Sequence, residues 1–225
     1  CRRRSSARSV RYRSWKRSFL ANTRSHRLSV LFSVALACGL RLGEVTGLRW
    51  EDVDLERGEL RIRVQLQALK KQLVLQELKT EKSQRTLALP TVCVDALRRH
   101  RTHQREERLK AGANWVDTRL VFTTFREKRG GKVGAALHPR NVLRTLYGLL
   151  AACNLPRVRF HDLRHSAASL LIAEGVELVE VSLLLGHSEL RVTADVYAHL
   201  QQQTSAKAAR HMDAIFFSGG QLGGR

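Results

Sequence analysis

Hydrophobic residues recur with helical spacing along most of the chain and alternate in one segment. Residues 28–39 (LSVLFSVALACG) are almost continuously apolar, which predicts a buried helix that stops at Gly39, a residue favoured just past a helix end. A second, short helix is predicted within residues 40–50. The alternation comes next, because Leu60, Ile62, Val64 and Leu66 are separated by polar residues that include Arg61 and Arg63. This pattern predicts a half-buried strand.

The segments around this strand predict a small antiparallel sheet. A turn is expected at Glu56–Gly58, ahead of the alternating strand, and residues 73–78 and 85–90 have the composition of two further strands. The connection between them, residues 79–84 (KTEKSQ), places Lys79 and Lys82 at or near a β-turn. The most economical arrangement is three antiparallel strands.

The remaining segments are predicted to be mainly helical. Residues 91–112 have one apolar edge (Val92, Val94, Leu97), residues 120–124 are strand-like, and the glycine-rich segment 125–137 predicts a hairpin or loop. Further helices are predicted at residues 139–154, 161–174, 177–185 and 189 to about 200. The sequence therefore predicts a mostly helical α+β fold with one small sheet.

Composition narrows the class of protein. The chain has 225 residues, 43% of them hydrophobic, which is enough for one core, and no apolar run reaches the roughly 18 to 20 residues of a membrane-spanning helix. The four cysteines form no CxxC pair, so neither disulfides nor a zinc site is expected. We therefore expect a soluble protein of the bacterial cytoplasm, with no membrane partner.

Charge favours a polyanionic partner. The chain contains 40 Lys and Arg against 20 Asp and Glu, an excess typical of proteins that bind nucleic acid. Ten of these basic residues lie in residues 1–27, which contain no acid and no hydrophobic period. We expect this segment to be an irregular basic arm, and a remnant of a cloning junction or gene boundary is an equally good interpretation.

The stretch RFHDLRHS concentrates candidate chemistry at the predicted start of a helix. His161 and Arg164, three residues apart, share a helix face, and free N–H groups at a helix N-terminus favour an anion such as phosphate. In the plainer alternative, His161 caps the helix and Arg164 forms a salt bridge. A metal site is the weakest alternative: His161 and His165 have zinc-ligand spacing, but Arg164 between them would repel a cation.

Five short motifs occur in order along the chain: GLRLGE, KTEKSQR, HDLRH, LLGHS and DVYAH. Together with the intervening segments LRWEDVDLERGEL, LVFTT and VLRTLYGLL, they resemble the tyrosine recombinase, or phage-type integrase, family from about His26 to Met212. The resemblance implies the fold of a tyrosine recombinase catalytic domain and a covalent 3′-phosphotyrosine reaction on double-stranded DNA, without cofactor or metal. It also implies a homotetramer on DNA.

The resemblance assigns roles residue by residue. It implies catalytic roles for Arg41, Lys79, His161, Arg164, His187 and the nucleophile Tyr197, and supporting roles for Glu44, Lys82 and His165. DNA contacts are expected from Arg63, Arg85 and Arg140. These residue types suit the chemistry: two guanidiniums can stabilise charge on a phosphorane, a histidine can accept a proton from a phenol, and a lysine can protonate the leaving hydroxyl.

The resemblance also suggests a division of the chain. We expect a catalytic domain at residues 28–213, a flexible tail at residues 214–225, and no separate N-terminal core-binding domain beyond the basic arm. Two other functions remain open. One is a type IB topoisomerase-like enzyme that nicks and recloses DNA as a monomer, and the other is a catalytically silent DNA-binding remnant of an integrase.

Overall fold

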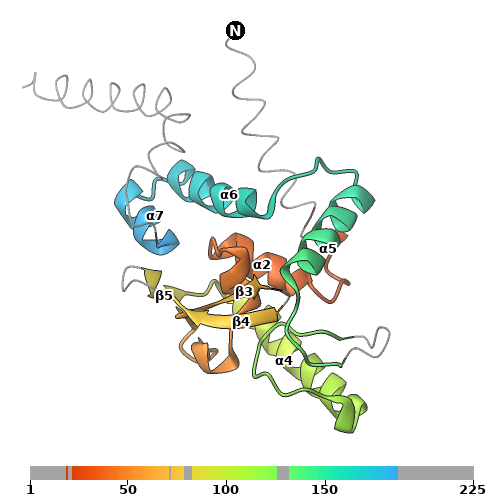
Figure 1. Ribbon diagram of the computed structural model, residues 1–225. Coiled ribbons are helices and arrows are strands. Elements are labelled where there is room, and N and C mark those ends of the chain that lie inside the picture. The colour runs from red at the N-terminus through yellow and green to blue at the C-terminus, as the bar shows by residue number, and fades with distance from the viewer. Residues whose placement is uncertain (1–18, 20–21, 71, 79–82, 126–131, 187–225) are drawn as a thin grey trace, which may run out of the picture.

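The computed structural model describes residues 19, 22–70, 72–78, 83–125 and 132–186. Its first two helices are α2 (Ser29–Ala37) and α3 (Leu42–Thr46), and both sequence predictions are confirmed. Gly39 ends the first helix region with φ +60°, a left-handed conformation that glycine adopts without steric cost. Helix α2 is buried along most of its length and forms the centre of the fold (Figure 1).

The strands form two small antiparallel sheets. After the 3-10 turn η1 (Trp50–Asp52) come β1 (Val53–Asp54), β2 (Glu59–Ile62), β3 (Val64–Leu69), β4 (Gln72–Glu77) and β5 (Arg85–Ala88). One sheet has the order β1-β2-β5 and the other pairs β3 with β4. A three-stranded antiparallel sheet is confirmed, but its strands differ from those predicted.

The difference arises at Arg63, where the alternating strand divides into β2 and β3. All four alternating apolar residues are buried, so the alternation continues across the division and gives no sign of it. What changes is the partner strand, because β2 pairs with β5 whereas β3 pairs with β4. The Arg63 carbonyl accepts the backbone N–H of Leu78, which marks the change of partner.

The second half of the chain is helical, as predicted. It contains α4 (Thr91–Ala111), η3 (Gly112–Asn114), α5 (Pro139–Ala152), α6 (Phe160–Ala173) and α7 (Leu178–Leu185). The predicted apolar edge of α4 is confirmed at Val94 and Leu97 but not at Val92, which is 71% exposed. The helix also buries Cys93, His100 and Gln104. The strand-like residues 120–124 form only isolated bridges, to Arg49 and Ala136.

Helix α2 joins the two halves of the molecule. It packs against α4 on one side and against α6 on the other, and α7 lies beside β5 at the far end of α6 (Figure 1). The rings of Phe19, Phe32 and Phe160 meet in the core between these helices. Burial raises the pKa of the Cys38 thiol to about 12, so this cysteine is a packing residue.

The described residues contain neither a membrane-spanning helix nor a cluster of candidate metal ligands. None of the helices there combines the length and apolar character needed to cross a bilayer. In the same residues, no group of three or more His, Cys, Asp or Glu side chains is arranged to hold a metal ion.

Candidate active site

Three arginines from three different elements meet at the end of α7. Arg85 Nε donates to the Leu184 carbonyl at 2.8 Å, and Arg41 Nη2 donates to the Gly186 carbonyl at 3.2 Å. Arg164 Nη2 donates to the carbonyl between them, that of Leu185. The last carbonyls of a helix lack partners within the helix and carry partial negative charge, so they attract cations. We call this group, Arg41, Arg85 and Arg164, the arginine cluster.

Glu44 supplies the one acidic side chain that pairs with the cluster in the described structure. Its carboxylate is completely buried and accepts from Arg41 Nη1 at 2.7 Å and from Arg85 Nη2 at 2.9 Å. The carboxylate also accepts the backbone N–H of Arg41, so Glu44 closes a capping box at the start of α3. Burial by itself would raise the pKa of Glu44, but hydrogen bonds and charge from Arg85, then from Arg41, hold it below the usual value.

Arg164 lies inside the protein, with 1% of its surface exposed. Its Nη1 donates to the Gly39 carbonyl at 2.7 Å, and its Nε is buried with no hydrogen-bond partner among the described residues. Burial, followed by the charges of Arg41 and Arg85, lowers the pKa of Arg164 to about 9, so it remains charged at neutral pH. Both of its hydrogen-bond partners in the described structure are carbonyls, so the salt-bridge alternative raised from the sequence finds no counterpart there.

His161 is exposed at the start of α6, one turn before Arg164. Its ring meets that of His165 edge to face, with centroids 4.5 Å apart. Partial burial lowers the pKa of His161, and the charges of His165, Arg164 and Arg41 lower it further. The lowered pKa favours the neutral imidazole, the form that can accept a proton.

Residues 16–204 of the chain match the phage integrase family. The chain belongs to this family. It is 36% identical over 205 residues to a tyrosine recombinase XerC-like protein of Caldanaerobacter subterraneus subsp. tengcongensis, covering 86% of this chain and 51% of that protein. It is 40% identical over 148 residues to an integrase of Streptomyces ambofaciens, covering 63% and 35% respectively. The chain thus spans about half or less of these curated relatives.

Solved structures share the integrase fold at low sequence identity. The integrase of transposon Tn1549, solved with transposon right end DNA, superposes with a TM-score of 0.73 at 19% identity, covering 88% of this chain and 64% of that one. XerA recombinase gives a TM-score of 0.63 at 19% identity, covering 85% and 62%. These likenesses show the fold and confirm the mostly helical α+β prediction.

The integrase motifs can now be located in the structure. GLRLGE, HDLRH and the start of LLGHS lie together, because Arg41 and Arg164 bond to carbonyls at the end of α7. Glu44 pairs with Arg41, and His161 lies close enough to Arg41 and Arg164 for their charges to lower its pKa. Lys79, Lys82, His187 and Tyr197 lie outside the described residues. His187 follows Gly186 directly in the sequence, and Gly186 accepts the hydrogen bond from Arg41.

The three expected DNA contacts occupy different environments. Arg140 is exposed at the start of α5. Arg63 is about half exposed and pairs with the buried Asp52. Arg85 has only 7% of its side chain exposed and donates from all three nitrogens to protein groups, so it lies inside the protein beside Glu44 and the end of α7.

A signal for the internal position of Arg85 was present in the sequence. Arg85 and Leu87 are two residues apart in β5 and therefore face the same side of the strand. Leu87 is buried, so the strand directs Arg85 inward as well. The two partners of Arg85, Glu44 and the end of α7, are distant in sequence and could not be read from the strand pattern.

Two hollows in the described surface lie away from the arginine cluster, along α4. The larger, about 530 Å³, has acidic residues of 51–56 on one wall and α4 arginines on the other, and the smaller, about 240 Å³, lies beside Trp50 and Trp115. None of the cluster residues lines either hollow. The larger hollow carries as many acidic as basic side chains, whereas the smaller one has four arginines against Asp117 and is therefore positively charged as well.

Proposed function

We propose that this chain is the catalytic part of a site-specific DNA recombinase that cleaves and rejoins strands through a 3′-phosphotyrosine. The observation that carries the proposal is the meeting of two motif arginines, Arg41 and Arg164, at the end of α7, with His161 near enough for their charges to lower its pKa. Only Glu44 balances the arginine cluster in the described structure, so a surplus of positive charge remains at this point. A DNA phosphate is the anion that such a surplus would attract.

In the first step the Tyr197 phenolate oxygen attacks the scissile phosphorus. A phenol has a pKa near ~10, so the tyrosine must lose its proton to a base, and neutral His161 takes that role. Negative charge grows on the two non-bridging oxygens as the bond forms. Arg41 and Arg164 stabilise it with N–H donors, and the buried Nε of Arg164 is one donor that no described protein group uses.

In the same step the bond from phosphorus to the 5′ oxygen breaks. Lys79, on the KTEKSQ turn, donates a proton to the leaving oxygen, and His187 donates a hydrogen bond to the phosphate. The product is a 3′-phosphotyrosine and a free 5′-hydroxyl. The phosphotyrosine ester retains the energy of the cleaved phosphodiester bond. A second 5′-hydroxyl can therefore attack the phosphotyrosine, release Tyr197 and join a new strand without a cofactor.

Duplex DNA is the proposed partner, with four copies of the protein acting together. Two relatives of the fold support the choice of DNA: the Tn1549 integrase was solved with transposon DNA, and the XerH recombinase was solved with its difH substrate after cleavage. The chain would act in the bacterial cytoplasm, where chromosomal DNA lies. The exposed Arg140 is a proposed phosphate contact outside the catalytic cluster.

The decisive experiment traps the covalent intermediate. The full chain is incubated with nicked duplexes of randomised flanking sequence, in which the short released strand diffuses away and blocks rejoining. We expect a DNA adduct that survives SDS, with a trapped sequence that identifies the site. Tyr197→Phe should abolish the adduct, whereas the matched control Tyr147→Phe, on α5, should keep it.

The outcomes separate the three hypotheses. An adduct with strand exchange between two duplexes supports the recombinase. An adduct accompanied only by relaxation of supercoiled DNA supports the topoisomerase-like enzyme. DNA retention without any adduct, at every salt concentration tested, would leave the silent DNA-binding remnant.

A further inference from the structure

We infer that Arg85 is a positioning residue for the proposed recombination reaction: it holds Glu44 and the end of α7 in place, and through them it aims Arg41 at the phosphate. The inference rests on the proposed function and extends it to a residue that need not touch DNA. It starts from the observation that the almost fully buried Arg85 side chain donates hydrogen bonds to three different segments of the chain.

Arg85 first fixes Glu44. Its Nη2 donates to Glu44 Oε2 at 2.9 Å and its Nη1 approaches Glu44 Oε1 at 3.3 Å, a forked pairing. The same two oxygens accept the backbone and the side chain of Arg41. Arg41 has 38% of its side chain exposed, so it depends on Glu44 for its direction. Without Arg85, the buried carboxylate would have to be balanced by Arg41 alone.

Arg85 also fixes the end of α7. Its Nε donates to the Leu184 carbonyl, and its side chain lies so close to Gly186 that a Cβ built there would be 3.0 Å from Arg85 Cδ. Gly186 has φ +64°, a left-handed conformation in which any side chain other than that of glycine would be strained. The Gly186 carbonyl is the second partner of Arg41, and Arg85 therefore supports both partners of that residue.

The same side chain reaches a third segment. Arg85 Nη1 donates to the Ser83 carbonyl at 3.3 Å, and Ser83 follows the KTEK segment directly in the sequence. Arg85 thus bonds to chain segments that lead on to Lys82 on one side and to His187 on the other. One buried guanidinium connects the start of α3, the end of α7 and Ser83, which follows the sequence segment that contains the proposed general acid.

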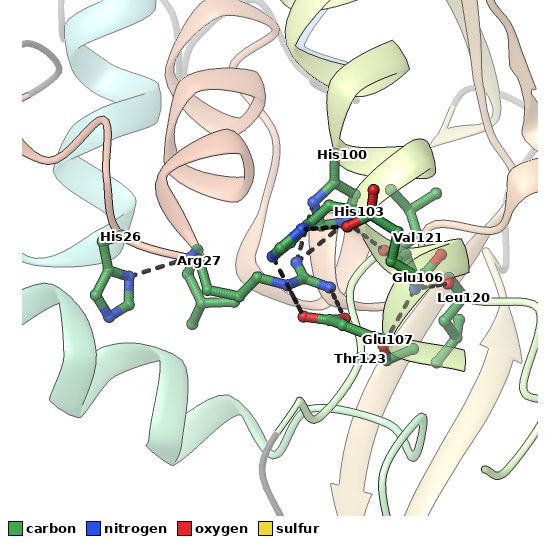
Figure 2. Close-up of polar contacts among 11 residues, drawn as sticks. His26, Arg27, His100, His103, Glu106, Glu107, Leu120, Val121 and Thr123 are labelled. Carbon is green, nitrogen blue, oxygen red and sulfur yellow. Dashed lines mark hydrogen bonds and ion pairs between the residues drawn. The ribbon is translucent and has the colours of Figure 1, made fainter. Parts of the chain in front are cut away.

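A matched control exists in the same chain. Arg27 forms a forked pair with Glu107 that is slightly more exposed than the pair of Arg85 and Glu44, with both N–O distances 2.7 Å, and its Nη1 approaches His100 Nδ1 at 3.0 Å (Figure 2). This pair joins the segment before α2 to α4, far from α7 in the fold (Figure 1). Breaking it should weaken the fold without redirecting Arg41, which separates a positioning effect from a loss of stability.

The experiment compares Arg85→Gln, Arg85→Lys and Arg27→Gln in the full chain. Adduct formation is timed with saturating nicked duplex, at a temperature where each variant is folded, and DNA affinity is measured separately. We expect Arg85→Gln to slow the reaction by about 10- to 100-fold with little change in DNA affinity. Effects of this size are typical when a residue that orients a catalytic group, without touching the substrate itself, is removed. Arg85→Lys should recover part of the rate because it keeps the charge, and Arg27→Gln should react at the wild-type rate.

A second readout does not require activity. The backbone N–H of Arg41 donates to Glu44 at 2.9 Å, so its hydrogen exchange, followed by NMR, should accelerate in Arg85→Gln and remain slow in Arg27→Gln. A folded Arg85→Gln with a rate within about threefold of wild type and a protected Arg41 amide would overturn the inference. If Arg85→Gln does not fold, an unchanged rate in Arg85→Lys would overturn it. If the wild-type chain forms no adduct, the proposed function fails, and amide exchange decides the inference by itself.

Discussion

Two buried clusters in this molecule are built from the same residue types and differ in their balance of charge. In the cluster of Arg27, Glu107 and His100, one guanidinium faces one carboxylate and a histidine, and all three Arg27 nitrogens have protein partners (Figure 2). At the end of α7, by contrast, the three guanidiniums of the arginine cluster have one carboxylate, Glu44, beside them. It pairs with two of them and acts on the third, Arg164, through its charge. The first cluster is neutral, and the second has a surplus of positive charge.

The difference indicates what each cluster is for. In a neutral, fully hydrogen-bonded ion pair, the attraction between the two charges offsets the cost of removing them from water. Such a pair can join two elements of the fold. Three guanidiniums near one carboxylate repel one another, and the carbonyls at the end of α7 offset only part of this repulsion. This arrangement stabilises the fold less than the neutral cluster does. A bound anion would balance its surplus of positive charge. The comparison thus predicts that damage to the first cluster appears in stability and damage to the second in reactivity.

The largest expected effect is on reactivity. Arg41→Gln removes a charged donor from the proposed transition state, so covalent adduct formation should fall by about 100- to 1000-fold. Because Arg41 is partly exposed and Arg85 still pairs with the buried Glu44, the free energy of unfolding should fall by less than the roughly 3 to 5 kcal/mol that breaking a fully buried ion pair costs. Timed adduct assays and urea denaturation test the two halves. A loss of stability without a loss of rate would reverse the comparison.

The next effect is on stability and depends on pH. Burial, and next the charge of Arg27, lower the pKa of His100 to about 4 from its ordinary 6.5, against opposing contributions from the Val121 carbonyl and Glu107. As the pH falls below 6.5, His100 binds a proton in the unfolded chain but remains neutral in the folded chain until the pH approaches 4. The stability contributed by this group is therefore complete above 6.5 and lost as pH falls to about 4, a total of about 3 kcal/mol.

The measurement compares denaturation at pH 7 with denaturation near pH 4 in wild type and His100→Gln. The variant should lose less stability on acidification, by about 3 kcal/mol. His103→Gln is the matched control, because His103 is exposed one turn further along α4. Equal acid sensitivity in wild type and His100→Gln would show that Arg27 and burial do not keep this histidine neutral.

The sequence predicted one of these clusters better than the other. Motif spacing identified Arg41, Glu44, His161 and Arg164, because each stands at a fixed place beside a helix start. Arg27, His100 and Glu107 carry no motif, and Arg27 fell within the segment expected to be irregular. Their pairing spans 80 residues and depends on how α4 packs against the segment before α2, which local periodicity cannot show.

The fold was predictable to the same extent. Helix ends followed from Gly39, Gly175 and Gly186, which all adopt positive φ. The division of the long strand at Arg63 did not, because burial alternates in the same way before and after it. Local patterns thus determine elements and their ends, whereas the choice of partner strand, like the pairing of Arg85 with Glu44, is made by tertiary contacts.

The smallest expected effect sharpens the comparison at the second histidine. His161, like His100, has a lowered pKa, but partial burial acts there together with the charges of His165, Arg164 and Arg41, against Asp162. Neutral imidazole is the proposed base, so adduct formation should fall about tenfold per pH unit in acid, with a midpoint below 6.5. Arg41→Gln removes one of those charges and should move the His161 pKa, followed by NMR, upward. His138→Gln, at the start of α5, should leave it unchanged. A pH midpoint of adduct formation at or above 6.5, or a His161 pKa that Arg41→Gln leaves unchanged, would contradict this prediction. Either result would mean that the charge of the arginine cluster does not lower the pKa of the proposed base.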